Sequence, residues 1–311
     1  MSQNNNDRHH YFFIPVKSTS ERVPGKNFKT VAGTGMKLYQ VLPTKIVEAM
    51  RQLDMKYTII MDTDSQEVID WAIAASRSKE VASSRGTVSY ITRNLRFCSN
   101  DFGGNFILRH GIGYLLSDEH PKNDPTDVIW QCFVTTPYLS VDTVKHVILT
   151  MDRIVGEKLV AASNSQVYDS ILTVVSQQGF FWSSGSNPTP IGGYCPEIML
   201  PTQKMPPLYK EIHGMFGITA QAFERYGCRT GATPFFYTVP TKEAIDIDWE
   251  EDAVKVFEKE HTPQTTSTKL TSLQYLEESG NQFVTALNHV VKSIVGAAQP
   301  QPQTGDQNDP R

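Results

Sequence analysis

The strongest constraint on the fold is a regular alternation of short apolar runs with longer amphipathic segments. The runs are rich in β-branched and aromatic side chains and are expected to be strands. They lie at residues 11–16, 57–61, 88–92, 127–135, 158–162, 180–183 and 235–239. The segments between them space their apolar side chains as helices do, at residues 37–53, 67–75, 105–116 and 141–154. This alternation predicts an α/β fold with a doubly wound, mainly parallel sheet covered by helices on both faces.

Composition and charge exclude several functions. With 311 residues, 39% of them hydrophobic, the chain can bury a large core. Its formal net charge of −4 gives no electrostatic footprint for nucleic acid. No apolar stretch approaches the roughly 18–20 residues of a membrane helix, and the polar start shows no targeting signal. We therefore expect a cytoplasmic protein with no nucleic-acid or membrane partner.

The chain is expected to contain one large domain at residues 11–261. Within it, residues 184–212 are rich in Gly, Pro and Ser and are expected to leave the sheet as a substrate lid or dimer contact. Residues 262–298 are expected to form a linker and an amphipathic helix that packs on this domain or on a second subunit. The polar residues 1–10 and the Gln/Pro-rich residues 299–311 are expected to be disordered.

A basic loop follows the first expected strand. Residues 13–29 read FIPVKSTSERVPGKNFK. Backbone N–H groups in a Ser- and Gly-containing loop of this kind point outward, and Lys17, Arg22 and Lys26 can neutralise phosphates. The segment is therefore a candidate phosphate cradle, although an ordinary solvated loop would have the same composition.

Two carboxylates near the end of the large domain are candidate metal ligands. Residues 244–254 read AIDIDWEEDAV, and on an extended chain Asp246 and Asp248 point the same way, with Cα atoms about 6.5 Å apart. Mg²⁺ prefers oxygen ligands of this kind. Asp248 with Glu251 would alternatively form a helix N-cap, but capping leaves Asp246 unexplained. We therefore expect Asp246 and Asp248 to hold Mg²⁺.

Three other polar residues have a structural interpretation, and two of them, Arg93 and His213, have a functional one as well. Asp64, with Glu67 three residues later, is a helix-capping pattern. Arg93 follows the third strand and would serve either a nucleobase or a surface ion pair. His213 precedes a glycine in a turn, where a histidine is either a substrate contact or part of the structure.

Taken in order, these segments resemble the CMP-sugar-acid synthetases, the cytidylyltransferase family that includes the acylneuraminate branch. The family's nucleotide loop, I-P-A-R-x-G-S-x-R-x-P-x-K-N, is matched at Ile14, Pro15, Ser20, Arg22, Pro24, Lys26 and Asn27. The loop departs from the pattern at Lys17, Thr19 and Glu21. Further matches are Arg93, the VTTPY segment with Thr135 and Thr136, Gln203 in LPTQKMPPLYK, and the DID element at residues 246–248.

The resemblance implies a Rossmann-like, GT-A-like nucleotidyltransferase that uses CTP and Mg²⁺. The enzyme would transfer CMP to the anomeric hydroxyl of a 2-keto-3-deoxy sugar acid, sialic-acid-like, and release pyrophosphate. The implied catalytic residues are Lys26, Arg22 and Asp248. The implied nucleotide contacts are Lys17, Ser20, Arg22, Lys26, Asn27 and Arg93. The implied contacts to the sugar acid are Thr135, Thr136, Gln203 and His213. We also expect a homodimer.

Two other functions stay open at this point. A glycosyltransferase or a different nucleotidyltransferase would use the same fold, because a fold does not fix a function. A non-catalytic scaffold is favoured by the departures in the loop and by Phe133, which stands where the acylneuraminate branch has Gln. The intact Asp246 and Asp248 argue against a scaffold. The ketodeoxyoctonate branch carries an acidic residue near the end of the fourth strand, and its absence argues against that substrate.

Overall fold

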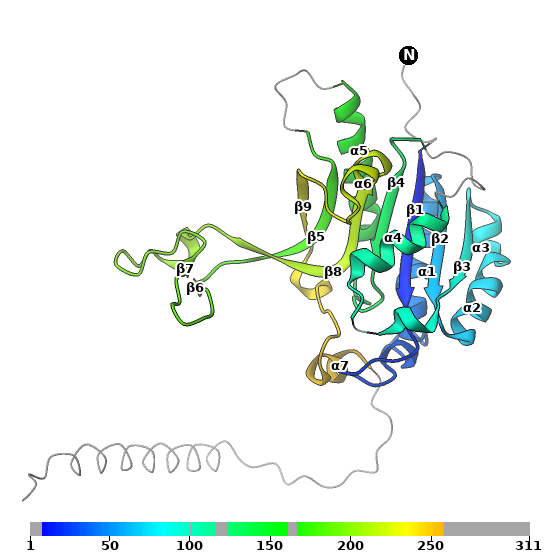
Figure 1. Ribbon diagram of the computed structural model, residues 1–311, viewed down its shortest axis with the longest axis horizontal. Coiled ribbons are helices and arrows are strands. Elements are labelled where there is room, and N and C mark those ends of the chain that lie inside the picture. Colours follow the sequence, from blue (N-terminus) through cyan, green and yellow to red (C-terminus); the bar gives the residue numbers. More distant parts are fainter. Residues whose placement is uncertain (1–7, 100, 116–123, 161–166, 258–311) are drawn as a thin grey trace, which may run out of the picture. The chain divides into compact units, whose positions relative to one another are not determined.

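The computed structural model describes residues 8–99, 101–115, 124–160 and 167–257. A seven-stranded sheet with the order β3-β2-β1-β4-β8-β5-β9 runs through it (Figure 1). Its strands are β1 (His9–Val16), β2 (Lys56–Thr63), β3 (Gly86–Thr92), β4 (Val128–Cys132), β5 (Ser170–Gln177), β8 (Leu208–Thr219) and β9 (Pro234–Thr238). The first four pair in parallel, as do β5 and β9, whereas β8 is antiparallel to both of its neighbours. The predicted doubly wound, mainly parallel α/β fold is confirmed.

Helices cover both faces of the sheet because successive residues of each strand point to opposite sides. Phe12 packs into the larger core cluster and Phe13 into the smaller one. The larger cluster includes side chains of α1 (Leu38–Leu53), α2 (Gln66–Ser76), α3 (Lys79–Ala82) and α5 (Val141–Val160). The smaller one includes side chains of α4 (Gly104–Leu115) and α6 (Ala220–Tyr226). The remaining helical segments are α7 (Glu250–Val256), η2 (Lys26–Phe28), η3 (Leu95–Cys98), η4 (Thr202–Lys204) and η5 (Thr241–Glu243).

The strand order reverses at β1. From β1 the chain moves outward through β2 and β3, and it then returns to the other side of β1 as β4. Loops that leave β1 and β4 therefore part from each other at the carboxyl edge of the sheet. In open α/β sheets this edge is where ligands bind.

Several expected boundaries need correction. β1 begins at His9, whose N–H donates to Asp127 Oδ1 at 2.9 Å, so residues 8–10 are not disordered. The strand expected at residues 158–162 is wrong, because α5 continues to Val160. Strands β5 and β8 were not predicted at all. Residues 1–7, the predicted helix at 262–298 and the predicted tail at 299–311 lie outside the described residues.

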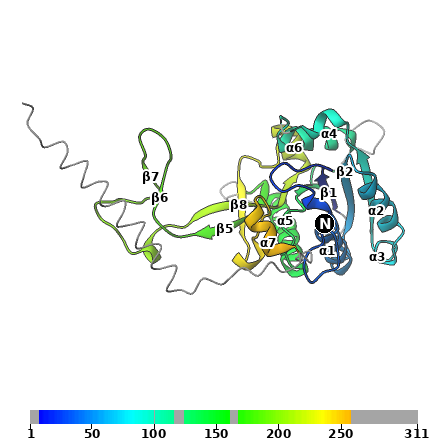
Figure 2. The ribbon, with the colours of Figure 1, turned by 90° about the horizontal axis from the view of Figure 1, so that it is seen from below.

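An arm formed by residues 178–207 projects from the ends of β5 and β8 (Figures 1 and 2). It holds a short antiparallel pair, β6 (Phe181–Trp182) and β7 (Pro190–Ile191). This arm corresponds to the excursion expected at residues 184–212, but it begins after Gln177, and residues 208–212 belong to β8. The arm exposes large apolar side chains, namely Phe180, Trp182, Ile191, Ile198, Met199 and Leu200.

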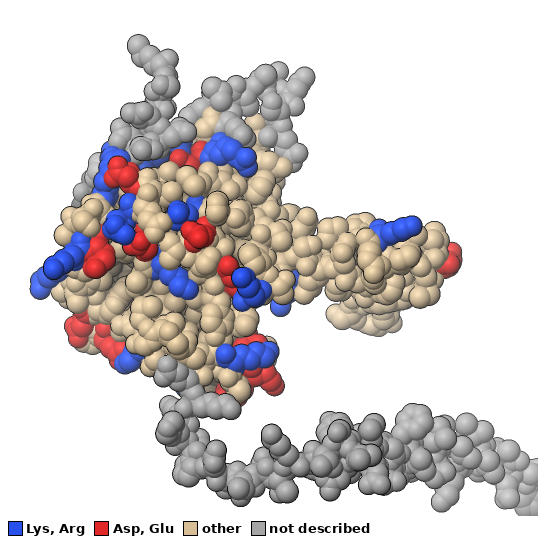
Figure 3. All heavy atoms as spheres, turned by 180° about the vertical axis from the view of Figure 1, so that it is seen from behind, with Lys and Arg blue, Asp and Glu red and all other residues tan. Residues whose placement is uncertain are grey.

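One face of the molecule carries charged side chains of both signs. In Figure 3, basic and acidic side chains are interspersed over the sheet domain, and the arm is largely uncharged. Among the described residues, every helix is too short or too polar to cross a membrane. The cytoplasmic location stays a prediction.

A buried polar cluster lies at the start of β1. His10 is fully buried, and its Nδ1 accepts a hydrogen bond of 3.0 Å from Trp130 Nε1. Its Nε2 lies 3.7 Å from Asp152 Oδ1, and Asp152 also pairs with Arg8. Burial, with smaller contributions from the charges of Arg8 and His9, lowers the pKa of His10 to about 3. The folded chain therefore holds this imidazole neutral.

We predict that His10 makes the fold acid-sensitive. Below pH 6.5 the unfolded chain protonates this imidazole and the folded chain does not, so the free energy of unfolding falls as the pH drops. From this group alone the loss is about 2 kcal/mol at pH 5. His10→Gln keeps an acceptor for Trp130 and does not titrate, so its stability should fall less between pH 7 and pH 5. Urea unfolding at the two pH values measures the difference, and parallel losses in both proteins would contradict the prediction.

Candidate functional site

A cavity of about 680 Å³ opens at the carboxyl edge of the sheet, beside the point where the strand order reverses. Its walls come from the loop after β1, the segment after β3, the start of α4, the end of β4, the middle of β8, the loop between α6 and β9 and the segment before α7. Nine of the residues predicted to form a site line it, namely Lys17, Ser20, Arg22, Lys26, Asn27, Arg93, Thr135, His213 and Asp248. The structure thus brings together residues that are up to 231 positions apart in the sequence.

The loop after β1 is held in place by Asp64 at the end of β2. Ser18 donates to this carboxylate twice, from its N–H to Oδ1 at 2.7 Å and from its hydroxyl to Oδ2 at 2.5 Å. Asn27 closes the loop from the other end, because its Nδ2 donates to Lys17 O at 2.9 Å. Gly25 has φ 66°, a conformation that glycine adopts without strain, and it turns the chain into η2. Hydrogen bonds therefore fix the conformation of this loop, which is not an ordinary solvated segment.

The prediction that Asp64 caps a helix is wrong. The N-cap of α2 is Ser65, whose side chain makes no capping hydrogen bond, and Glu67 instead pairs with Lys37 at 2.8 Å. Burial alone would raise the pKa of Asp64, but the hydrogen bonds from Ser18 outweigh it and lower that pKa. The Asp64 carboxylate is charged at neutral pH and stabilises the conformation of the loop after β1.

Lys26 joins the β1 loop to the acidic segment before α7. It is buried, its Nζ donates to Ile247 O at 2.5 Å, and the same atom lies 4.0 Å from Asp248 Oδ1. Burial lowers the pKa of Lys26, and the charges of Asp248 and Asp246 oppose that shift. This cation therefore holds two walls of the cavity together.

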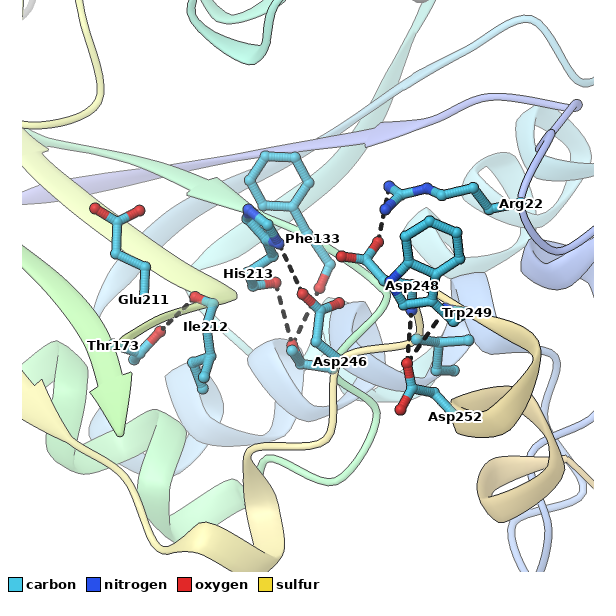
Figure 4. Close-up of polar contacts among 12 residues, drawn as sticks. Arg22, Phe133, Thr173, Glu211, Ile212, His213, Asp246, Asp248, Trp249 and Asp252 are labelled. Atoms are coloured by element: carbon cyan, nitrogen blue, oxygen red, sulfur yellow. Dashed lines mark hydrogen bonds and ion pairs between the residues drawn. The ribbon is translucent and has the colours of Figure 1, made fainter. Parts of the chain in front are cut away.

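Arg22 approaches the same carboxylate from the solvent side. Its Nη2 lies 2.9 Å from Asp248 Oδ1, and its guanidinium carbon lies 5.3 Å from the centre of the Trp249 ring (Figure 4). The Arg22 side chain is 50% exposed, against 10% for Lys26. Arg22 is therefore free to move to a ligand at little cost, whereas Lys26 is not.

The alternative interpretation of Asp248 as a helix cap is wrong. Asp252 Oδ2 accepts hydrogen bonds from the N–H groups of Asp248 and Trp249, at 3.3 and 3.2 Å, so Asp252 caps α7 (Figure 4). The segment is also fixed to the end of β4, because Ile247 N–H donates to Thr135 O at 2.9 Å. The Asp248 carboxylate is left to face the cavity.

Asp246 is hydrogen-bonded to His213. His213 Nδ1 donates to Asp246 Oδ2 at 2.7 Å, and this hydrogen bond raises the pKa of His213 although burial opposes the shift. Burial would raise the pKa of Asp246, but hydrogen bonds from His213 and Thr135 outweigh it and lower that pKa. The His213 ring also meets the Phe133 ring edge-on, with centres 5.6 Å apart. His213 is thus fixed at the cavity wall by two contacts.

The acidic pair fits a divalent cation. Ligand atoms of His213, Asp246 and Asp248 all lie within 4.8 Å of one another. Asp246 Oδ1 is buried and has no hydrogen-bond partner among the described residues. A buried, unsatisfied carboxylate oxygen is costly unless something binds it, and hard cations take such oxygens as ligands.

The remaining predicted residues have mainly structural contacts. Arg93 is buried and donates from Nε and Nη2 to Asp62 Oδ2, at 2.8 and 2.5 Å, so its ion pair lies in the interior and not at the surface. Thr136 is fully buried, and its hydroxyl donates to backbone oxygens of Phe133 and His213. Gln203 is exposed in η4 on the arm. Arg93 still lines the cavity, whereas Thr136 and Gln203 do not.

The polar wall residues Gln131 and Arg229 were not predicted from the sequence. Gln131 lies inside the apolar run of β4, for which only a strand was predicted. Arg229 lies in the loop between α6 and β9, which carries no motif. The sequence held one signal for these two residues, a polar residue within an otherwise apolar strand. That signal indicates a site residue at Gln131 and not at Arg229.

Comparison with known proteins gives only distant similarity. No protein family and no curated protein matches the sequence. Among solved structures, the chain is similar to 4-diphosphocytidyl-2C-methyl-D-erythritol synthase from Anaerococcus prevotii DSM 20548, with 9% identity and a TM-score of 0.47 over 81% of this chain and 95% of that chain. It is also similar to a CMP:2-keto-3-deoxy-manno-octonic acid synthetase complexed with CTP, with 11% identity and a TM-score of 0.45 over 79% and 95% of the two chains. Similarity at this level transfers no activity to the present chain.

We predict that Asp64→Asn loosens the β1 loop without unfolding the protein. An amide cannot accept both hydrogen bonds from Ser18, so local opening of the loop should become on the order of tenfold more frequent. Trypsin cleavage after Lys17, Arg22 and Lys26, followed by mass spectrometry, measures that opening. Asp70→Asn makes the same change at an exposed position of α2 and should leave the cleavage rate unaltered. Equal rates in the two variants would contradict the assigned role of Asp64.

Proposed function

We propose that this chain transfers CMP from CTP to the anomeric hydroxyl of a sialic-acid-like 2-keto-3-deoxy sugar acid and releases pyrophosphate. One observation carries the proposal: the cations of the β1 loop meet the Asp248 carboxylate in one cavity, at the edge of the sheet where the strand order reverses. Asp246 lies next to this cavity, with a carboxylate oxygen within 4.8 Å of one of Asp248. A nucleoside triphosphate with its metal needs both kinds of group at once. The choice of CTP and of a sugar acid is supported by the resemblance of the loop and of the DID element to the CMP-sugar-acid synthetases.

In this proposal the β1 loop binds the triphosphate. Lys17 and Arg22 line the cavity and would neutralise the phosphates, and Ser20 lies between them on the same wall. Arg22 would exchange its contact with Asp248 for a phosphate oxygen, as its exposure permits. Lys26 would hold the loop against the acidic segment and add positive charge behind the phosphates. Arg93, which reaches the cavity from the end of β3, would contact the base.

The proposed reaction needs positioning and not a protein nucleophile. The anomeric oxygen attacks the α-phosphorus in line, and a new P–O bond forms as the bond to the bridging oxygen breaks. Pyrophosphate leaves with that electron pair, and the hydroxyl proton passes to water. The cations of the loop stabilise the charge that develops on the departing pyrophosphate.

Asp246 and Asp248 would hold Mg²⁺, with His213 and Thr135 orienting Asp246. When bound, the ion would polarise the α-phosphate and lower the pKa of the attacking hydroxyl. The hydrogen bond from His213 leaves one oxygen of Asp246 available, and Arg22 leaves Asp248 when it moves to a phosphate. The arrival of the nucleotide would thereby release Asp248 for the metal, beside the oxygen of Asp246 that is already available.

Thermal unfolding with each of the four nucleoside triphosphates, with and without Mg²⁺, tests the function. CTP with Mg²⁺ should stabilise the chain selectively, by about 2.7 kcal/mol at one hundred times its dissociation constant. Asp248→Asn should abolish the Mg²⁺-dependent part of the shift and the release of pyrophosphate, with little loss of stability in the absence of ligand. Glu250→Gln, at an exposed position two residues later, is the matched control and should behave like the wild type.

Other outcomes separate the alternatives. An equal response to all four triphosphates, or none, would contradict a cytidylyltransferase. Stabilisation by a nucleotide-sugar without release of pyrophosphate would favour a glycosyltransferase. Selective binding of CTP that supports no pyrophosphate release with any sugar acid would favour a non-catalytic scaffold.

We also propose that the arm joins two copies of the chain into a homodimer. Its exposed apolar side chains form the kind of surface that marks a protein contact. Gln203 lies on the arm and not in the cavity of its own chain, so any contact between Gln203 and a sugar acid requires the arm of a second copy.

Ile198→Asp should therefore dissociate the dimer, because it places a charge at a position that is 68% exposed in the single chain. Val254→Asp, on α7 and 66% exposed, is the control outside the arm and should leave the dimer intact. Sedimentation velocity measures both, and a monomeric wild type would rule out the proposed dimer.

A further inference from the structure

Arg229 is a cavity residue whose guanidinium is fixed against aromatic rings. Its guanidinium carbon lies 3.8 Å from the centre of the Phe216 ring and 5.8 Å from that of Phe133. Its Nη2 lies 3.1 Å from Glu211 Oε2, and among the described residues Glu211 is the one hydrogen-bond partner found for this side chain. The Arg229 side chain is 22% exposed and lines the cavity. A guanidinium has five N–H donors, so most of them stay available to a ligand.

The loop that carries Arg229 is clamped on both sides. Arg229 N–H donates to Asn105 Oδ1 at 3.2 Å. Further along, Asp169 accepts hydrogen bonds from the N–H groups of Ala232 and Thr233, at 2.9 and 3.1 Å. Gly231 permits this clamp, because a Cβ at that position would lie 2.2 Å from Asp169 Oδ1. The backbone therefore presents the arginine in one place before any ligand arrives.

An unfilled hydrogen-bond acceptor lies close to this guanidinium. Gln131 is 1% exposed, its Nε2 donates to Gly104 O at 3.0 Å, and its Oε1 is buried without a partner among the described residues. A Cβ placed on Gly104 would lie 3.9 Å from both Gln131 Oε1 and Arg229 Nη1. Because Gly104 has no side chain, a space is left beside the Arg229 guanidinium and the unsatisfied amide oxygen of Gln131.

We propose that Arg229 binds the carboxylate of the acceptor and that Gln131 Oε1 accepts a hydrogen bond from one of its hydroxyl groups. This inference rests on the proposed function and assigns the subsite for its second substrate. A planar guanidinium matches a carboxylate through two parallel hydrogen bonds. An unsatisfied amide oxygen in the interior favours a ligand that brings a donor.

The charges around the subsite favour a monoanion. Glu211 already offsets part of the charge of Arg229, so the subsite suits one carboxylate better than a triphosphate. The cations proposed to bind the phosphates come from another segment that lines the cavity, the loop after β1. A small hydroxylated carboxylic acid satisfies both Arg229 and Gln131 at once.

Binding of sugar acids and of their methyl esters tests the assignment. Calorimetric titration with N-acetylneuraminate and with 2-keto-3-deoxyoctonate, each beside its neutral methyl ester, isolates the contribution of the carboxylate. At least one acid should bind the wild type on the order of 10- to 100-fold more tightly than its ester. Arg229→Gln should remove that preference and leave the affinities for the ester and for CTP unchanged. Arg225→Gln makes the same change at an exposed position of α6 and should keep the preference.

Substitutions at Gly104 test the subsite without touching Arg229. Gly104→Ala adds a methyl group at ordinary contact distances, so the acid should still bind. Gly104→Leu fills the space and should abolish binding of both acid and ester, while CTP still stabilises the fold. Retained binding of CTP shows that each variant is folded.

The outcomes separate this inference from the proposed function. If CTP binds but neither acid binds the wild type, or if acid and ester bind alike, the subsite is overturned and the nucleotide site stands. An equal loss of acid and ester in Arg229→Gln would likewise overturn it, since that result describes a merely structural arginine. If CTP fails to bind while the preference for the acid over its ester depends on Arg229, the subsite is supported and the proposed transfer of CMP is contradicted.

Discussion

The parallel pairing of β1 with both β2 and β4 is the constraint on which the candidate site depends. Because the chain leaves β1 toward β2 and later returns beside it as β4, the loops after β1 and β4 diverge at the carboxyl edge. The divergence opens a cavity while the packed core is kept, since Phe12 and Phe13 of β1 stay fully buried in the clusters on the two faces of the sheet. The loop after β1 then needs a partner from outside its own strand, and Asp64, at the end of the neighbouring β2, supplies it.

In the single chain the charged groups of the cavity largely satisfy one another. Arg22 pairs with Asp248, and His213 pairs with Asp246. The groups left over include buried acceptors, since both Asp246 Oδ1 and Gln131 Oε1 are without a partner among the described residues, and also most of the N–H donors of Arg229. Such buried acceptors destabilise a fold by about 1–3 kcal/mol each unless a ligand or water binds them. We therefore expect the folded chain to gain stability when a ligand binds in this cavity.

Periodicity was enough to predict the part of the fold in which each strand is followed by its own helix. It failed where the chain stops alternating. β8 was missed because Gly214 and Gly217 interrupt its apolar pattern, yet Gly217 is required there, since a Cβ would lie 2.6 Å from the Trp130 ring. In the candidate site, sequence motifs predicted those residues that lie close together in the sequence, such as the residues of the β1 loop. They did not find Arg229, because its position is set by the clamp at Asp169, a tertiary contact that leaves no local pattern.

One strand connects the arm with the cavity. β8 spans 12 residues, from Leu208 at the base of the arm to Thr219 between β4 and β5. Its pairing with β5 shifts register between Glu211 and Phe216, so the regular ladder is interrupted around His213. An interruption of this kind bends a strand and leaves residues without a ladder partner. His213 therefore lies at the joint between the arm and the sheet, so a change in the direction of the arm has a mechanical route to the interior of the domain.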